Sequence, residues 1–110
     1  MVAATVGHIV HTVHDVEEEA MQRKEQVQRV IDGDTLTTAA RKHPVRLANV
    51  NAPEKGERGA IAATKALASL VRGKAVTVDT VARDKYGRSV ANVKVGGRSV
   101  NAAMRKKGYK

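Results

Sequence analysis

Residues 26–50 read QVQRVIDGDTLTTAARKHPVRLANV. This stretch contains three short runs typical of β-strands, at residues 26–31, 35–40 and 45–50. Asp32-Gly33 stands between the first two runs and is typical of a tight hairpin turn, while Lys42-His43-Pro44 separates the second run from the third. The stretch therefore predicts three consecutive strands, the first two joined by a hairpin.

The chain after residue 50 adds two strands and two helices to this pattern. Strand-like runs cover residues 74–81 and 89–95. Residues 59–71 are rich in Ala and Leu and are followed by Gly73, which indicates a helix between the third and fourth strands. A short C-terminal helix is expected at 100–107, before Gly108. This order is that of a five-stranded OB-type barrel, so we predict an α+β, mostly β fold.

The first 25 residues have a different pattern. Apolar residues recur there at three- and four-residue spacing, which predicts an amphipathic helix, although the β-branched residues of 9–13 would also suit a strand. His8, His11 and His14 follow one another in steps of three, so on a helix they fan out and cannot all bind one metal ion. We predict an N-terminal helical extension, residues 1–25, and one barrel domain, residues 26–110.

No window of the sequence approaches the length of a membrane span, and the N-terminus lacks the basic start of an export signal. We expect no membrane association and, for the chain as given, a cytoplasmic location. A chain from which an export signal had been removed would look the same and would be secreted. The chain has no cysteine, which excludes disulfides and thiolate metal sites.

The formal charge of +9 is unevenly distributed along the chain. Residues 1–34 carry seven acidic and three basic side chains, so the remaining residues hold +13. Such a charge attracts polyanions, although a solvated basic surface or packing against ribosomal RNA would show the same composition. Phe and Trp are absent and Tyr86 and Tyr109 are the only aromatic residues, which disfavours binding by base stacking. We expect a nucleic-acid partner held mainly through its phosphates.

Each residue that could take part in catalysis or metal binding has an ordinary structural explanation when it is considered alone. Asp32-Gly33-Asp34 is first of all a turn, and the residues after it lack the ligand pattern of an EF-hand. Arg46 could be an edge charge of a strand, and Arg88 an exposed turn residue. Glu54, which follows Pro53, could favour a helix N-terminus through the helix dipole. Only the combination of these residues is informative.

Four sequence segments carry that combination. They are VIDGDTL at 30–36, VRLANVNAPE at 45–54, RDKYGRSVANV at 83–93 and VNAAMRKKG at 100–108. In this order they resemble the staphylococcal nuclease (thermonuclease) family. The resemblance covers most of residues 26–110, whereas the first 25 residues match no pattern of that family.

The resemblance implies a calcium site. In that family the acidic turn and the segment after the third strand bind calcium, and the matching ligands here are Asp34, Asn51, the carbonyl of Ala52, and Glu54. Asp32 and Thr35 would support the turn. Oxygen ligands of this kind suit Ca²⁺, which accepts mixed carboxylate, carbonyl and water coordination.

The resemblance also assigns residues to the reaction. Glu54 matches the family's general base or water-orienting carboxylate, and Arg46 and Arg88 match its two phosphate-binding arginines. Lys85 and Tyr86 fall where the family contacts a terminal phosphate. Hydrolysis of a phosphodiester adds negative charge to the phosphoryl oxygens and needs a water in line with the leaving oxygen, so a cation, two guanidinium groups and a carboxylate suit it. We expect three loops remote in sequence to set these groups around one anion.

The sequence departs from the family pattern at several positions. Asn51 stands where the family usually has Asp, which removes one negative charge and predicts weaker Ca²⁺ binding. Ala52 replaces a common Thr, which is harmless where only the carbonyl is used. The loop at 55–58 is short, and the family's last helix with its base-stacking aromatic residues is missing, a role that Tyr109 could take in part. We expect poor base contacts.

The sequence therefore predicts a calcium-dependent endonuclease that hydrolyses DNA, RNA or both with low sequence specificity, as a monomer. The alternative is a nucleic-acid-binding module of the same barrel without efficient catalysis, in which Arg46 and Arg88 only bind backbone phosphate. Glu54 argues against this alternative, because a simple phosphate binder has no need of a carboxylate beside two arginines. A third possibility is a protein-interaction or ribosome-associated barrel.

Overall fold

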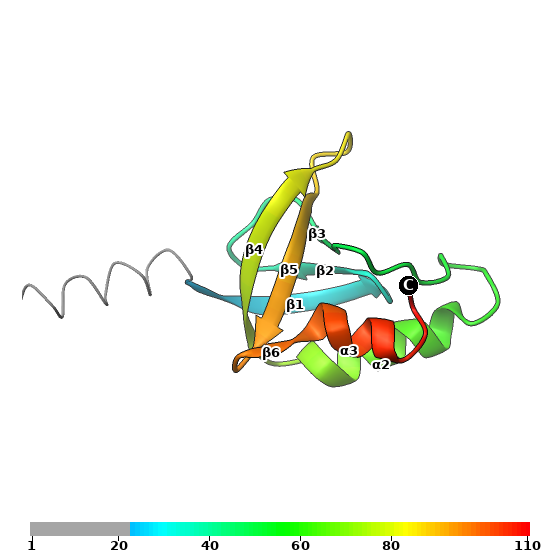
Figure 1. The fold of residues 1–110 in the computed structure, drawn as a ribbon. Coiled ribbons are helices and arrows are strands. Elements are labelled where there is room, and N and C mark those ends of the chain that lie inside the picture. Colours follow the sequence, from blue (N-terminus) through cyan, green and yellow to red (C-terminus); the bar gives the residue numbers. More distant parts are fainter. Residues whose placement is uncertain (1–22) are drawn as a thin grey trace, which may run out of the picture.

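The computed structural model describes residues 23–110, so the helix expected over residues 1–25 lies almost entirely outside the described residues. In chain order the described elements are β1 (Lys24–Asp32), β2 (Thr35–Thr38), β3 (Val45–Leu47), α2 (Ala60–Val71), β4 (Ala75–Arg83), β5 (Ser89–Val95), β6 (Arg98–Ser99) and α3 (Val100–Lys106) (Figure 1). Lys24 and Glu25, which the sequence pattern assigned to the extension, belong to β1. Neither described helix is long and apolar enough to cross a membrane.

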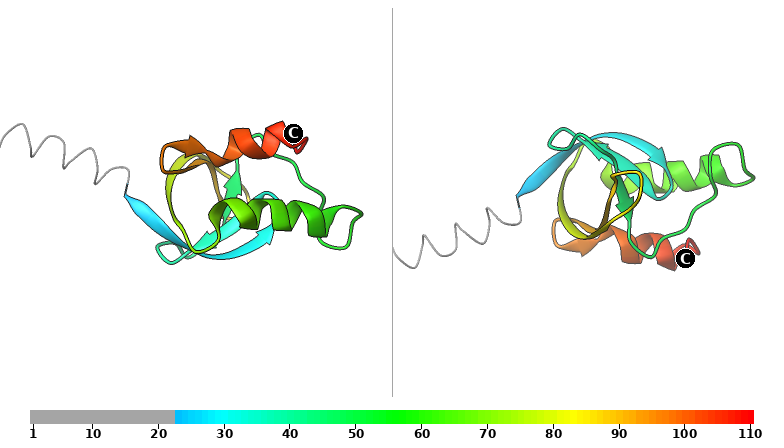
Figure 2. Two further views of the ribbon diagram at one scale, coloured as in Figure 1. Left: turned by 90° about the horizontal axis from the view of Figure 1, so that it is seen from below. Right: turned by 90° about the horizontal axis from the view of Figure 1, so that it is seen from above.

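Five of the described strands close into a ring. The sheet order is β3-β2-β1-β4-β5-β6, and β3 also pairs with β5, which joins the two ends of the five-stranded part. The β3–β5 pair is parallel and the other pairs are antiparallel. Figure 2 shows the ring with α2 and α3 beside it. The mostly β fold with a five-stranded ring and two helices confirms the coarse part of the prediction, whereas the sequence pattern did not predict β6.

Two strands are shorter than the runs that predicted them. β2 ends at Thr38, before a turn at residues 39–40, and β3 ends at Leu47. The chain leaves β3 through a turn that includes Asn49, whose φ of 57° lies in the left-handed region that Asn adopts more readily than most residues. Beyond this turn the Ala52 amide reaches the Asp34 side chain. The early end of β3 therefore returns the chain to the β1–β2 turn.

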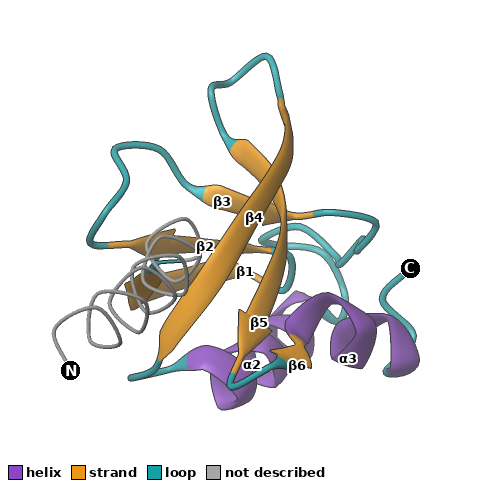
Figure 3. Cartoon of the chain, turned by 60° about the vertical axis from the view of Figure 1, so that its left-hand side comes forward, coloured by secondary structure: helices purple, strands orange, loops and turns teal. Residues whose placement is uncertain are grey.

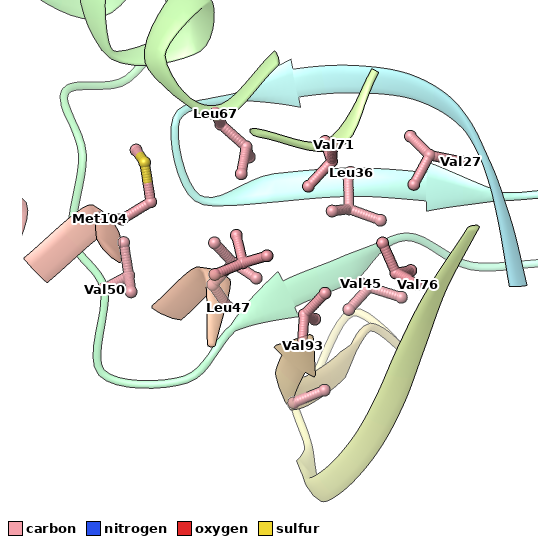
Figure 4. Packing of buried hydrophobic residues seen from close by; sticks show 12 residues of the cluster. Val27, Leu36, Val45, Leu47, Val50, Leu67, Val71, Val76, Val93 and Met104 are labelled. Atoms are coloured by element: carbon pink, nitrogen blue, oxygen red, sulfur yellow. The ribbon is translucent and has the colours of Figure 1, made fainter. Parts of the chain in front are cut away.

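The hydrophobic core fills the inside of the ring, and side chains of the two helices complete it (Figure 4). Alternate residues of a strand point to the same face, and here one face of each long strand supplies the core. The largest apolar side chains that are fully buried are Leu36, Val45, Leu47, Val50, Val76 and Val93 of the strands and their connections, Leu67 and Val71 of α2, and Met104 of α3. Each such burial stabilises the fold by about 1.5–3 kcal/mol.

Asn101 is a buried polar residue of α3 that joins this helix to the ring. Its Oδ1 accepts a hydrogen bond of 2.8 Å from the Val93 amide, and its Nδ2 donates to the carbonyls of Ala48 and Ala91 at 3.0 Å each. Because a buried backbone group that loses its partner costs about 1–3 kcal/mol, we expect Asn101→Ala to lower the free energy of unfolding by about 2 kcal/mol in urea titrations. The exposed Ala102 gives the control, since Ala102→Ser should leave the midpoint nearly unchanged. Equal stability of Asn101→Ala and the wild type would contradict this role.

Candidate active site

Asp34 links the β1–β2 turn to the segment that follows β3. Its Oδ1 accepts a hydrogen bond of 2.9 Å from the Thr35 hydroxyl, and its Oδ2 accepts one of 3.1 Å from the Ala52 amide. The Leu47 amide also donates to the Asp34 carbonyl at 2.8 Å. The Asp34 side chain is 13% exposed, and these contacts fix its position. The Thr35 hydroxyl thus contacts the Asp34 carboxylate, and the support of the turn by Thr35 stays a prediction.

Arg46 lies at the centre of the next set of contacts. Its Nη1 donates to the carbonyls of Leu47 at 2.7 Å and Val50 at 2.6 Å. Its Nη2 donates to Oδ1 of Asn51 at 3.0 Å and lies 3.5 Å from Oδ2 of Asp34. One guanidinium group thus holds the loop after β3 closed and gathers two of the oxygen ligands that the sequence suggested. Within the described residues its Nε has no hydrogen-bond acceptor and is free for a ligand.

Arg88 belongs to a second cluster in the turn between β4 and β5. Its Nε donates to Oδ2 of Asp84, whose Oδ1 accepts hydrogen bonds of 2.9 Å from the backbone amides of Tyr86 and Arg88. Partial burial opposes ionisation of Asp84, but these hydrogen bonds outweigh it and hold the pKa of that carboxyl below its ordinary value. The Tyr86 ring is exposed, with Lys85 Nζ 5.3 Å and the Arg88 guanidinium carbon 5.4 Å from its centroid. Three of the expected substrate residues therefore share one ordered turn.

Strand pairing relates the two clusters. Arg46 is the register partner of Thr35 on one side and of Val90 on the other. Arg88 precedes Val90 by two residues, so the alternation of side chains along a strand places Arg88 on the same face of the sheet as Arg46. The ends of β2, β3 and β5 thus bring Asp34, Arg46 and Arg88 to neighbouring strands, although no residue pair among them is adjacent in sequence.

Glu54 lies in the loop before α2 and is exposed. Its amide donates to Oε1 of Glu57 at 2.6 Å, and its carbonyl accepts from the Glu57 amide at 2.8 Å. Within residues 23–110 no hydrogen bond or ion pair joins Glu54 to Arg46 or Arg88. The structure therefore brings Asp34, Arg46, Asn51 and Ala52 into direct contact, while the convergence of Glu54 on the two arginines stays a prediction.

The oxygen atoms of the first cluster suit a hard cation in type. The Asp34 carboxylate and the Asn51 amide oxygen, both of a type that Ca²⁺ binds, contact the same nitrogen of the Arg46 guanidinium group. Asp32 ends β1 at the register position of Thr35. Across the described part of the chain no three His, Cys, Asp or Glu side chains gather closely enough to hold a metal ion. Any calcium would therefore depend on amide and carbonyl oxygens and on water beside at most two carboxylates.

Two features of the site were missing from the sequence analysis. The first is Asp84, which orients Arg88; the spacing of four residues between an acid and an arginine in RDKYGR is a signal that could have identified it. The second is the pair of backbone carbonyls that Arg46 binds, for which the sequence holds no signal. Tyr109, considered as a stacking residue, is instead partly buried against the core, so Tyr86 presents the more accessible ring.

Comparison with known proteins places this chain in a family. The family model described as Staphylococcal nuclease homologue matches residues 44–110. "Protein ParB" of Escherichia coli is 40% identical over 90 residues, which cover 72% of this chain and 51% of that protein. An "Uncharacterized endonuclease" of Escherichia coli O157:H7 is 42% identical over 82 residues, covering 72% of this chain and 54% of that protein.

A further "Uncharacterized endonuclease", from Haemophilus influenzae, is 35% identical over 86 residues, which cover 76% of this chain and 48% of that protein. The chain thus spans about half the length of these curated relatives. The family model covers more than half of the chain and includes Arg46, Asn51, Glu54 and Arg88. The chain belongs to the staphylococcal nuclease family.

Proposed function

We propose that this chain is a metal-dependent nuclease that hydrolyses phosphodiester bonds of DNA, RNA or both. The observation that carries the proposal is the contact between Asp34, Arg46 and Asn51, which joins two loops remote in sequence around a partly exposed guanidinium group. The family and the endonuclease names of its relatives support the same reaction class.

The residues present divide the work of hydrolysis between charge and positioning. Arg88 binds the phosphoryl oxygens through its Nη donors and Arg46 through its Nε, and both guanidinium groups offset the charge that develops in the transition state. Glu54 orients or deprotonates the attacking water, and its exposure leaves room for water and substrate around it. Lys85 and Tyr86 contact a terminal phosphate beside Arg88.

We further propose Ca²⁺ as the metal, held by Asp34, Asn51, the Ala52 carbonyl and Glu54. When bound, it would supply positive charge at a phosphoryl oxygen. The neutral amide of Asn51 in this set lowers the expected affinity for Ca²⁺. Low sequence specificity follows from the scarcity of aromatic side chains for base contacts, and we propose that the chain acts as a monomer.

A second function is favoured by the contacts of Arg46. Both hydrogens of its Nη1 are used by backbone carbonyls, which leaves fewer donors for a phosphoryl group than a dedicated clamp would have. A nucleic-acid-binding module with little catalysis would need only the charge that remains. The two functions differ in one respect: the nuclease requires the Glu54 carboxylate and the module does not.

A cleavage assay with matched variants separates them. Labelled single- and double-stranded DNA and RNA are incubated with the protein in Ca²⁺, in Mg²⁺ or with chelator. We expect Glu54→Gln to lower the cleavage rate at least about a hundredfold, which is the usual contribution of a positioned general base, and Arg88→Ala to weaken both cleavage and binding. The controls are Glu57→Gln, which keeps an oxygen for the Glu54 amide, and Arg72→Ala at the exposed end of α2.

The outcomes point to different functions. Cleavage that stops with chelator and with Glu54→Gln, but not with Glu57→Gln, supports the nuclease. Tight binding without cleavage in any divalent ion supports the binding module. Cleavage that persists unchanged in chelator and in Glu54→Gln would exclude both the metal and the assigned carboxylate.

A further inference from the structure

A polar cavity of about 380 Å³ lies beside the β4–β5 turn, where β4 ends and β5 begins, outside the cluster built around Arg46. Its charged and polar walls come from β1, the β2–β3 loop and the ends of β4 and β5, and they comprise Glu25, Arg41, Lys42, His43, Arg83 and Ser89. We call this cavity the basic pocket. It contains one acidic residue against three permanently cationic ones, and no residue of it has a role in the proposed reaction.

Glu25 and Arg41 form the floor of the basic pocket. Glu25 is 8% exposed, and its two oxygens accept hydrogen bonds from Arg41 at 2.7 and 2.8 Å and from the Thr38 hydroxyl at 2.8 Å. Burial opposes ionisation of Glu25, but these hydrogen bonds outweigh it and keep its pKa below the ordinary value. Arg41 also donates to the Ser89 hydroxyl at 3.0 Å. The one acidic charge is thus cancelled, and the floor is held rigidly in place.

Lys42, His43 and Arg83 line the rest of the pocket. With Glu25 neutralised by Arg41, the pocket keeps the positive charges of Lys42 and Arg83. Within the described residues neither cation has an ion-pair partner, and Arg83 makes only a 3.5 Å hydrogen bond to the Gly87 carbonyl. The His43 ring lies against Gly87, where an added Cβ would stand 3.4 Å from it. This contact holds the β2–β3 loop against the β4–β5 turn, so the pocket is assembled before any anion arrives.

The basic pocket and the candidate active site lie on opposite sides of the same strand ends. Arg83 and Ser89 are register partners and both line the pocket. Arg88 is the neighbour of Ser89, so the alternation of a strand directs its side chain to the other face, where it meets Asp84. Figure 3 shows the β2–β3 loop and the β4–β5 turn projecting from the same side of the ring, away from the helices. A strand bound at Arg88 reaches the pocket by crossing this turn.

We propose that the basic pocket binds a backbone phosphate of the nucleic-acid strand whose other phosphates occupy the candidate active site. The inference rests on the proposed function for the identity of the ligand. The pocket recognises the phosphate through the two cations Lys42 and Arg83, because the charge of Glu25 is already neutralised by Arg41. Inorganic phosphate shares this chemistry, but a strand that crosses the turn gains both contacts within one molecule, which favours the strand. The residues that line the pocket include no Phe, Tyr or Trp, so we expect little base preference at this contact.

The test measures oligonucleotide affinity in the presence of chelator, which prevents metal-dependent cleavage and keeps the result independent of catalysis. The probes are a labelled trinucleotide, too short to cross the turn, and a labelled dodecanucleotide, followed by fluorescence anisotropy through a salt titration. The variant Lys42→Gln/Arg83→Gln removes the two free cations. The matched control Lys65→Gln/Arg72→Gln removes two exposed cations of the α2 region and the same net charge.

We expect the pocket variant to weaken dodecanucleotide binding about tenfold at low salt and to reduce the slope of log affinity against log salt by about 0.7, the loss of one single-strand phosphate contact. Trinucleotide affinity and the control variant should change little. An equal loss of dodecanucleotide affinity in both double variants would show that only the net charge of the protein matters, and it would overturn the proposal. Unchanged dodecanucleotide affinity, with inorganic phosphate still shifting the His43 NMR signals, would assign free phosphate instead and overturn it too.

The two proposals fail in different experiments. A protein that never cleaves would remove the nuclease assignment, yet the difference between the pocket variant and its control would still be measurable. Both variants change exposed side chains, and melting curves of each variant serve to check that folding is intact. The single charge reversal Lys42→Glu gives a second test, because it should weaken dodecanucleotide binding further than Lys42→Gln while leaving trinucleotide binding unchanged.

Discussion

Replacing Arg46 with alanine is expected to lower the free energy of unfolding by about 3 kcal/mol, because it leaves hydrogen-bonding groups of a partly buried loop unpaired. The Leu47 and Val50 carbonyls both depend on its Nη1, and Asn51 and Asp34 both contact its Nη2. Under the proposed function the same change should reduce cleavage at least about a thousandfold, since it removes a charge that opposes the transition-state charge and releases two metal ligands.

Two further variants separate the roles of Arg46. Arg46→Lys keeps the positive charge but cannot hold two carbonyls and a side-chain oxygen at once, so it should recover little stability and little activity. Arg29→Ala, at an exposed position of β1, gives a control for loss of a strand arginine and should change the unfolding midpoint slightly. Urea titrations and single-turnover cleavage provide the measurements. Full stability of Arg46→Ala would show that the loop after β3 does not need this guanidinium group.

The position of Arg46 could be predicted from the sequence, but its contacts could not. A strand and a phosphate-binding arginine follow from the motif VRLANVNAPE, whereas the hydrogen bonds to Leu47 and Val50 depend on the turn at Asn49. The apolar run continues to Val50, so its pattern predicts a longer strand than β3. A left-handed residue within a strand-like run ends the strand without changing the hydrophobic pattern, and only the coordinates reveal it.

Two ion pairs of the structure show that a contact between charged residues is harder to predict when the residues are far apart in the sequence. Asp84 and Arg88 are four residues apart in one turn, and local spacing alone could have suggested their contact. Glu25 and Arg41 are sixteen residues apart and meet because the β1–β2 hairpin places the start of one strand beside the end of the other. Without the hairpin register, the sequence distinguishes Glu25 in no way from the other acidic residues of the N-terminal segment. The basic pocket could not be predicted for this reason.

The hairpin turn itself was predictable, but its tight packing was not. The preference of Asp and Gly for turns is enough to predict a turn at Asp32-Gly33. This preference attributes the glycine to the freedom of its backbone. In the structure Gly33 is buried, and an added Cβ would lie 2.6 Å from the Cβ of Ala63 and 2.7 Å from the Cβ of Ala52. The requirement for glycine is therefore one of space between the turn, α2 and the loop that carries the proposed metal ligands.

Gly33→Ala is expected to lower the free energy of unfolding by about 3 kcal/mol, at the upper end of the usual cost of overpacking, because neither alanine has a flexible end that can move aside. The displaced Ala52 should also misplace its amide against Asp34, so cleavage should fall with stability. Gly73→Ala is the matched control: φ there is 71° and no atom lies within 4 Å of an added Cβ. That change carries only the conformational cost of a left-handed residue, about 1 kcal/mol, and should leave cleavage unchanged.

Rescue distinguishes crowding from any other effect of Gly33→Ala. Adding Ala63→Gly and Ala52→Gly removes both of the closest atoms and should restore part of the stability. Recovery should stay incomplete, because the Ala63 backbone carbon still lies 3.0 Å from the new Cβ and glycine weakens α2 by about 1 kcal/mol. Thermal melts of the wild type, the single variant and the triple variant measure these differences. A triple variant less stable than Gly33→Ala by the full cost of its two added glycines would show that crowding does not set the requirement.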